Sequence, residues 1–203
     1  MGLEFEVKYR ATTELLDRLK KELSGKWQRI DMETTYYDTA DGSLGDRRYT
    51  LRRRFENGVS ICALKTPGKG LGRGEWEVQA ASVEVAILEL CKLGAPEELI
   101  SMTASGVQPV CGARFTRYAA QVEWDGGAVE VALDQGILFA GDRQEPLCEV
   151  EVELKSGTQE AALAFAEDLA SRYGLIRLET SKFRRALDLR KETENGTAET
   201  TVF

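Results

Sequence analysis

Strict alternation of apolar and polar residues predicts that most of the chain forms β-strands. The pattern is clearest in Leu3–Arg10 and in Pro146–Leu154, where charged residues alternate with Phe, Val, Tyr or Leu. It recurs in six other segments, namely Tyr49–Phe55, Val59–Lys65, Gly74–Ala80, Phe115–Trp124, Ala128–Asp134 and Phe183–Leu189. Between two of these strands, Asn57-Gly58 predicts a tight hairpin turn. The sequence therefore predicts eight strands.

Helical periodicity is confined to four segments. Leucines or alanines recur there at intervals of three and four residues, with a Thr or Pro near the start or a Gly after the end. The predicted helices are Thr13–Leu23, Ser82–Leu93, Pro96–Met102 and Gln159–Tyr173. No internal repeat or long linker divides the chain, so residues 1–190 are expected to form one domain. Residues 191–203 are polar and are expected to be a flexible tail.

The charged faces of these strands predict how the sheet closes. A single charged face, such as Glu149, Glu151 and Glu153, is usually solvated, and a run such as Arg52–Arg54 usually lies on the surface. Here the same pattern recurs on at least five strands, and the opposite faces of the first strand and of Pro146–Leu154 are apolar throughout. If these strands close into a barrel, the charged faces would lie inside it and the helices would cover the apolar faces outside.

Composition removes several kinds of chemistry. The 203 residues include no histidine, which excludes Ser-His-Asp triads, Cys-His dyads and histidine-ligated metal sites. A net charge of −7 argues against general nucleic-acid binding, which depends on a basic surface. No segment is apolar enough to span a membrane, and the N-terminus is predicted to be a strand, not a signal peptide. The four cysteines form no CxxC pair, as expected of a reduced, cytoplasmic protein.

A barrel interior lined by both carboxylates and cations cannot be a hydrophobic core. Carboxylates a few ångströms apart repel one another, and a divalent cation relieves that repulsion. Oxygen ligands without His or Cys suit Mg²⁺ or Mn²⁺, whereas Arg and Lys suit phosphate. The glycine-rich segment Thr66–Gly74 lacks the GxxxxGK[ST] pattern of a P-loop. The interior therefore favours a complex of metal and polyphosphate.

Several motifs resemble those of one family, the CYTH domain or triphosphate tunnel metalloenzymes. Glu4-Phe5-Glu6-Val7-Lys8 is similar to its ExExK signature, and Leu51–Arg54 to its LRxR strand. Further segments follow in the family's order over about residues 1–190, namely Ala63–Lys65, Arg73–Glu77, Glu130–Gly136, Cys148–Gly157 and Ser181-Lys182 with Arg185. Of these, Glu130–Gly136, Cys148–Gly157 and Ser181-Lys182 with Arg185 resemble the inorganic triphosphatase branch.

The resemblance implies an α+β fold, an eight-stranded antiparallel β-barrel with flanking α-helices. Its tunnel would bind triphosphate with Mg²⁺ or Mn²⁺, and we expect two ions. The metal ligands it implies are Glu4, Glu6, Glu149, Glu151 and Glu153, of which Glu149 matches the family pattern less closely, with Glu77 and Asp134 as further candidates. The phosphate-binding residues it implies are Lys8, Arg52, Arg54, Lys65, Arg73, Arg117, Lys182 and Arg185. Glu75, Glu77 and Asp134 would orient these cations or assist a second ion. Lys8, Glu6 and Glu75 are the expected catalytic residues.

The activity implied is hydrolysis of inorganic triphosphate to pyrophosphate and phosphate. A thiamine or nucleoside triphosphatase would share the tunnel but would need a pocket for the organic group. Four aromatic residues could supply it, namely Trp27, Tyr36, Tyr37 and Trp76. A class IV-like adenylate cyclase and a non-enzymatic polyphosphate-binding module are two further hypotheses. We expect a small-molecule substrate, neither nucleic acid nor membrane as a partner, and a monomer or homodimer.

Overall fold

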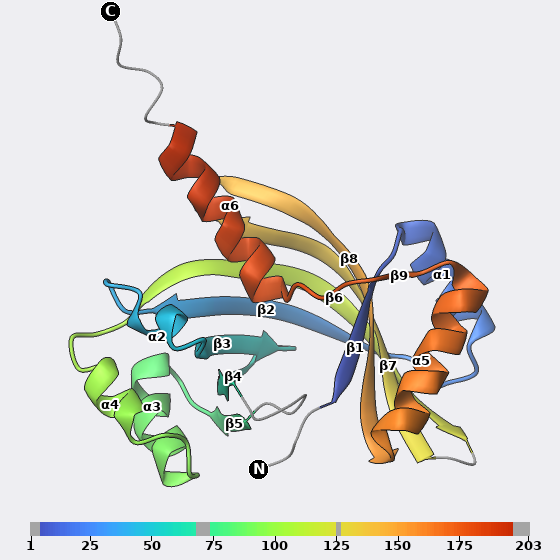
Figure 1. The fold of residues 1–203 in the computed structure, drawn as a ribbon, viewed down its shortest axis with the longest axis horizontal. Coiled ribbons are helices and arrows are strands. Elements are labelled where there is room, and N and C mark those ends of the chain that lie inside the picture. The colour runs from blue at the N-terminus through green and yellow to red at the C-terminus, as the bar shows by residue number, and fades with distance from the viewer. Residues whose placement is uncertain (1–4, 68–73, 125–126, 197–203) are drawn as a thin grey trace, which may run out of the picture.

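The protein is a strongly curved antiparallel sheet with helices packed around it (Figure 1). The structure, a computed structural model, describes residues 5–67, 74–124 and 127–196, without the side chains of residues 124 and 191–196. Its strands are β1 (Glu6–Arg10), β2 (Gln28–Asp38), β3 (Thr50–Glu56), β4 (Val59–Thr66), β5 (Gly74–Gln79), β6 (Gln108–Trp124), β7 (Gly127–Ala140), β8 (Arg143–Gly157) and β9 (Ile176–Arg177). Its helices are α1 (Thr13–Glu22), α2 (Ser43–Asp46), α3 (Val83–Lys92), α4 (Glu98–Met102), α5 (Gln159–Tyr173) and α6 (Lys182–Gly196).

The sheet is antiparallel but it does not close into the expected barrel. Its strand order is β5-β4-β3-β2-β6-β7-β8-β1-β9, so β5 and β9 are the two edges. Closure would require β1 to pair with β5. Instead β9 pairs with β1 at Tyr9 and Arg10, and the backbone N–H of Leu178 donates to the carbonyl of Lys8 at 2.8 Å. The α+β class, the antiparallel sheet and the flanking helices are confirmed, whereas the sheet has nine strands and stays open.

Besides the short helix α2 and the short strand β9, which were not predicted, two longer elements differ from the sequence prediction. Strand β2 was not predicted, although Ile30, Met32 and Tyr36 alternate along it with polar residues. The segment Phe183–Leu189, predicted as a strand, is part of helix α6. Its apolar residues Phe183, Ala186 and Leu187 have the spacing of one helical face and pack against the sheet. Helix α6 also continues to Gly196, into the segment expected to be structureless.

Most other elements follow their local signals. The N-caps of α1, α3 and α5 are Thr12, Ser82 and Thr158, whose side-chain oxygens accept hydrogen bonds from backbone N–H groups in the first turn. Helix α5 has the predicted bounds and ends at Gly174, whose φ of 65° is left-handed. The hairpin between β3 and β4 turns at Asn57 and Gly58, which both have positive φ.

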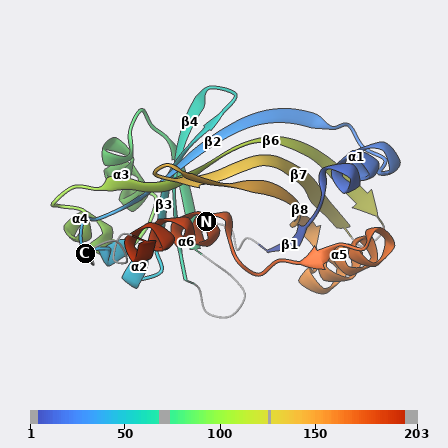
Figure 2. The same ribbon diagram turned by 90° about the horizontal axis from the view of Figure 1, so that it is seen from above.

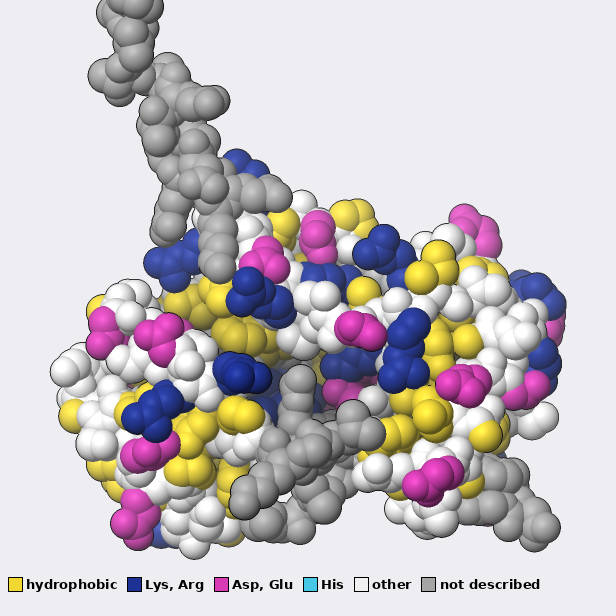
Figure 3. All heavy atoms as spheres, in the orientation of Figure 1, with side chains coloured by type: hydrophobic (Ala, Val, Ile, Leu, Met, Phe, Trp, Pro, Cys, Tyr) yellow, Lys and Arg dark blue, Asp and Glu magenta, His cyan; other side chains and the backbone are white. Residues whose placement is uncertain are grey.

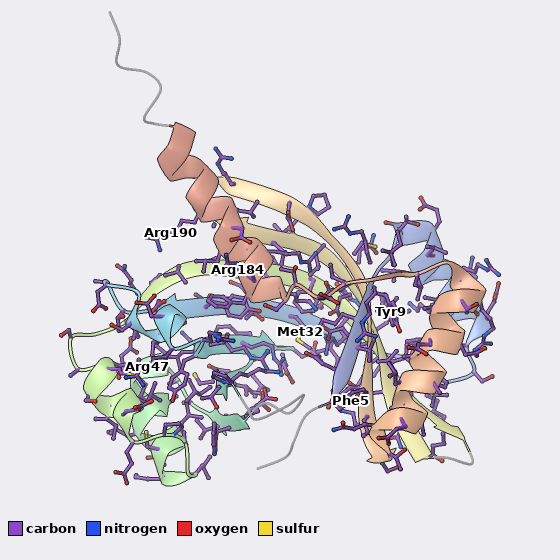
Figure 4. The ribbon with its side chains drawn as sticks, viewed as in Figure 1. Phe5, Tyr9, Met32, Arg47, Arg184 and Arg190 are labelled. Carbon is purple, nitrogen blue, oxygen red and sulfur yellow. The ribbon has the colours of Figure 1, made fainter. Side chains whose placement is uncertain are left out.

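Three apolar clusters hold the helices on the sheet. Helices α1 and α5 cover the outer face of β1, β7 and β8, and α3 and α4 cover the outer face of β3 to β5. Figure 2 shows these two helix pairs at opposite ends of the molecule, with α6 between them. Helix α6 lies on the inner face, over Met32, Phe115 and Leu147. Figure 4 shows Met32 below α6, Tyr9 on β1 and Phe5 just before it, both on the side of α5.

Apolar residues of most strands therefore face outward to the helices, and the alternate positions face inward. Val7 is buried outside on β1 while Glu6 and Lys8 line the interior, and Leu64 is buried outside on β4 while Lys65 faces in. Because side chains alternate along a strand, burial of one face determines where all the charged residues go. The charged interior expected from the sequence is present.

Candidate active site in the charged channel

The concave face of the sheet surrounds a cavity of about 340 Å³, near the lower end of the range usual for ligand pockets, about 300–1,000 Å³. Strands β1 to β8 and helix α6 all contribute side chains to it. Its charged lining is Glu6, Lys8, Arg52, Arg54, Glu56, Lys65, Glu75, Glu77, Arg117, Glu130, Glu151, Glu153, Lys155 and Lys182. Figure 3 shows basic and acidic side chains gathered in a recess between the two helix-covered ends.

One wall of the channel carries cations held in place by carboxylates. Arg52 Nη2 lies 3.3 Å from Glu75 and 3.2 Å from Glu77, and Arg54 Nη2 lies 3.7 Å from Glu77. Lys65 Nζ lies 3.3 Å from the same oxygen of Glu75. Burial, with the neighbouring charge of Arg52, lowers the pKa of Arg54 from its ordinary value. Arg54 also pairs with Glu56, so the three cations of this wall are held in position by three carboxylates.

At the other wall three carboxylates converge, of which only Glu151 lines the cavity. Ligand oxygens of Asp134, Glu149 and Glu151 all lie within 4.8 Å of one another, and all three residues are buried. Asp134 comes from β7, and the other two come from β8, where Glu149 is the cross-strand partner of Asp134. Among the residues that the structure describes, this is the one group of three His, Cys, Asp or Glu side chains close enough to share a metal ion. We refer to it as the acidic triplet.

Cations from two elements, β6 and α6, surround the acidic triplet. The Lys182 ammonium contacts all three carboxylates, at 2.8 Å from both Asp134 and Glu151 and also close to Glu149. Arg117 donates two hydrogen bonds to Asp134, at 2.8 and 2.7 Å, and one to Glu151 at 2.5 Å. Arg185 donates to Glu149 at 2.5 Å. Three positive charges thus face three negative ones, which offsets the cost of burying them.

These contacts shift the pKa values of the groups. Burial lowers the pKa of Lys182, but the negative charges of Asp134, Glu151 and Glu149 raise it by more. The pKa of Lys182 therefore lies above its ordinary value. Burial raises the pKa of Glu151, but the positive charges of Lys182, Arg117 and Lys8 lower it by more. The pKa of Glu151 therefore lies well below its ordinary value. Lys182 is therefore protonated and Glu151 ionised at neutral pH.

Lys8 lies between the two glutamates that face it in the channel. Its ammonium is 2.7 Å from Glu6 and 3.8 Å from Glu151. Burial lowers the pKa of Lys8, but these two carboxylates raise it above its ordinary value. Lys8 thus presents a positive charge to the lumen at neutral pH and cannot act there as a base.

The structure brings together most of the residues singled out in the sequence. Glu6, Glu151 and Glu153 line the cavity with the cations of β3 and β4, whereas Asp134, Glu149 and Arg185 lie behind the lining, in contact with Lys182 or Glu149. Glu4 and Arg73 fall outside the described residues. Whether each residue has its expected role stays a prediction.

Three charged lining residues were missing from the predicted site, namely Glu56, Glu130 and Lys155. Lys155 Nζ lies 2.8 Å from Glu153 and 3.8 Å from Glu130. Lys155 continues the alternation of Glu149, Glu151 and Glu153, so its position in the interior could have been read from the sequence.

The aromatic residues do not gather at the channel. Trp27 packs with the α1 and α5 cluster, and Tyr37 and Trp76 pack with the α3 and α4 cluster, all on the outer face. Tyr36 lines the cavity, but it is buried and its ring lies 4.9 Å from that of Phe183. Within the described chain, these four residues form no shared platform for an organic group.

Comparison with known proteins decides the family. Residues 2–187, almost the entire chain, match the CYTH domain. The chain belongs to the CYTH domain family. This CYTH domain is 34% identical over 163 residues to a protein of Haemophilus influenzae named inorganic triphosphatase, an alignment that covers 78% of the chain. It covers 46% of the relative, so the chain spans about half the length of the curated relative it matches.

Solved structures share the fold at lower identity. The PH1819 protein of Pyrococcus horikoshii OT3 is 21% identical with a TM-score of 0.63, covering 91% of this chain and 98% of that one. HpAC1 from Hippeastrum, reported with a dominant triphosphatase activity, is 19% identical with a TM-score of 0.61, covering 90% and 93%. At these identities the likeness supports the fold alone. None of the helices that the structure describes has the length and apolar character to cross a membrane.

Proposed function

We propose that the channel of this CYTH domain hydrolyses inorganic triphosphate to pyrophosphate and phosphate with the help of a divalent metal ion. The observation that carries the proposal is the small cavity lined by Arg52, Arg54 and Lys65 on one wall and by Glu6, Glu151 and Glu153 on the other. The name of the relative from Haemophilus influenzae supports the substrate. The outward position of Trp27, Tyr37 and Trp76 supports an inorganic substrate over one with an organic group.

The residues present fit a hard divalent cation. Glu6 and the acidic triplet offer only carboxylate oxygens, the donors that Mg²⁺ and Mn²⁺ prefer. Such an ion, held by Glu151 with Glu6 and Glu153, which are cross-strand partners on β1 and β8, would supply neutralisation of phosphate charge and acidification of a water. Asp134 and Glu149, with the undescribed Glu4, remain candidates for the second ion.

The cations of the channel would position the substrate. Arg52, Arg54 and Lys65 would bind phosphate oxygens, because guanidinium and ammonium groups form strong charge-assisted hydrogen bonds to them. Glu75 and Glu77 would keep these side chains in position, so little reorganisation is needed when charge shifts to the leaving pyrophosphate. Lys8 stays protonated and would stabilise charge on the transferred group.

The test is release of phosphate from triphosphate, thiamine triphosphate and ATP, each with Mg²⁺, with Mn²⁺ and with EDTA. We expect turnover of triphosphate that requires the metal and a kcat/KM higher than for the two organic substrates. Chromatography of the ATP reaction would detect cyclic AMP if the chain were a cyclase. A purified, folded protein that leaves triphosphate intact with both metals would refute the proposal.

A pair of matched variants tests the site itself. Glu6→Gln removes a channel carboxylate without changing its volume, and we expect turnover to fall by about a hundredfold or more, since a catalytic metal contributes several kcal/mol. Glu33→Gln makes the same change on the outer face of β2, where the side chain is 53% exposed. It should leave turnover unchanged. Equal activity of the two variants would contradict the metal role of Glu6.

A further inference from the structure

The most exposed apolar residues of the protein are concentrated on one face. Among the residues that the structure describes, six large apolar side chains are exposed, and four of them lie between residues 85 and 100. Val85 and Leu88 are on α3, Leu93 caps its C-terminus and Ile100 is on α4. Figure 1 shows the two helices together at one end of the molecule, away from α6. Single exposed apolar residues are ordinary, whereas a group of them typically marks an interface.

Helix α3 is apolar on two opposite sides. One side packs against the outer face of β3 to β5 through Val83, Ala86, Ile87 and Leu90. Val85 and Leu88 lie on the other side of the helix, where they are 57% and 53% exposed. A surface helix ordinarily carries polar residues at such positions. The described part of the chain therefore leaves the second apolar side of α3 open to solvent.

A groove of about 650 Å³ lies between α3 and α4 on this face. Its lining is Leu88, Cys91, Lys92, Glu97, Ile100, Ser101 and Ala104. Ser101 and Ala104 have short side chains, so the groove has room for a residue of a helix that packs on α3 from another molecule.

The charges of α3 complement a second copy of the same helix. Glu84 lies in the first turn and Lys92 in the last, each four residues from Leu88. If two copies pack antiparallel across a two-fold axis at Leu88, Glu84 faces the partner's Lys92 at both ends. Both residues lie about 6 Å from the axis along the helix, so the charged ends meet in register. Lys92 pairs with Glu89 at 2.7 Å in its own chain, but it is 71% exposed and can also reach a second carboxylate.

We propose that the face formed by Val85, Leu88, Leu93 and Ile100 is the interface of a homodimer, with its two-fold axis near Leu88. Burial of these apolar side chains supplies the affinity. The ion pairs between Glu84 and the partner's Lys92 set the antiparallel orientation more than they add affinity, because they lie at the rim. The channel lies on the other face of the sheet from α3, so it stays open in both copies.

Sedimentation velocity over a dilution series tests the proposal without any substrate. We expect a concentration-dependent dimer in the wild-type protein. Leu88→Asp should raise the dissociation constant at least tenfold, because a carboxylate of each copy would be buried without a partner. Ile176→Asp is the matched control, since Ile176 is 68% exposed on β9, outside the proposed interface, and this variant should dimerise like the wild-type protein. A wild-type protein that is monomeric at every concentration, or a dimer equally strong in Leu88→Asp, would overturn the proposal.

An exchange of charges tests the antiparallel arrangement. Glu84→Lys alone places a lysine against the partner's Lys92 and should weaken the dimer at least tenfold. Adding Lys92→Glu restores opposite charges and should return the dissociation constant to within about threefold of the wild-type value. A double variant as weak as the single one would contradict the proposal.

Cross-linking provides a measurement that does not depend on the folding of Leu88→Asp. In Leu88→Cys the new thiols of the two copies lie next to the two-fold axis, so mild oxidation should yield a disulfide-linked dimer. Ile176→Cys, with an equally accessible thiol outside the interface, should stay unlinked under the same conditions. Equal yields from the two variants would also overturn the proposal.

Discussion

Replacing Lys182 by methionine tests how much the ion pairs between this lysine and the acidic triplet stabilise the fold. Methionine keeps most of the side-chain volume but leaves one carboxylate charge of the acidic triplet uncompensated. Removing one partner of a buried ion pair typically costs about 3–5 kcal/mol. Arg117 and Arg185 still compensate two carboxylates, so we expect the lower value, about 3 kcal/mol. For a domain of this size that corresponds to a fall in Tm of about 6–12 °C.

The loss should depend on pH in a defined direction. In the wild-type protein the lowered pKa of Glu151 means that its ionised form stabilises the fold above about pH 4.5, and this stabilisation is lost as the pH falls through the lowered pKa. In Lys182→Met the uncompensated carboxylates have higher pKa values and are neutralised by protonation earlier on acidification. The difference in unfolding free energy between the two proteins should therefore be largest at neutral pH and should shrink towards pH 5.

The assay is urea unfolding in EDTA at pH 7 and pH 5, followed by tryptophan fluorescence. Lys92→Met is the control, because Lys92 is 71% exposed and its pairing with Glu89 on the surface of α3 should contribute less than about 1 kcal/mol. A loss below about 1 kcal/mol for Lys182→Met at pH 7 would refute the reasoning. So would a loss that is the same at both pH values.

Three other predictions concern single residues. Arg54→Ala should lower kcat/KM for triphosphate at least tenfold, since a charge-assisted bond contributes about 1.5–3 kcal/mol, whereas Arg53→Ala on the outer face should change it less than threefold. If the two variants lowered kcat/KM equally in steady-state kinetics, the assignment of Arg54 to the substrate channel would be contradicted. Gly136→Ala should destabilise the protein by about 1–3 kcal/mol in urea, because its Cβ would lie 2.1 Å from the carbonyl oxygen of Arg114. Unchanged stability would contradict the close approach. Burial raises the pKa of Cys111 to about 12, so it should resist alkylation at pH 8 until the protein unfolds, and rapid labelling of the folded protein would contradict its burial.

The sequence by itself determined which face of most strands is charged. Alternation is local, and burial of the apolar set sends Glu6, Arg52, Arg54, Lys65 and Glu151 to the same side of the sheet. Helix α5 and the hairpin at Gly58 were equally local, because a cap or a turn depends on a few neighbouring residues. These signals were sufficient for the α+β class and for the charged interior.

The segment Phe183–Leu189 shows where local pattern failed. Its apolar spacing suits both a short strand and a helix, and the packing of Phe183 and Ala186 on the inner face of the sheet decides for the helix. Closure of the sheet likewise could not be predicted from the sequence, since it depends on whether β9 or β5 pairs with the free edge of β1. Both outcomes rest on contacts between residues far apart in the chain.

Only the tertiary structure decided how the charges are partnered. Nothing local distinguishes Glu149 from Glu153 on β8, yet Glu149 is buried with Lys182 and Arg185 while Glu153 faces Lys155 in the channel. The difference arises because α6 crosses one end of the inner face and brings its cations to one part of β8. An alternating sequence determines the face on which a charge lies, but its partner is determined by which distant element packs against that face.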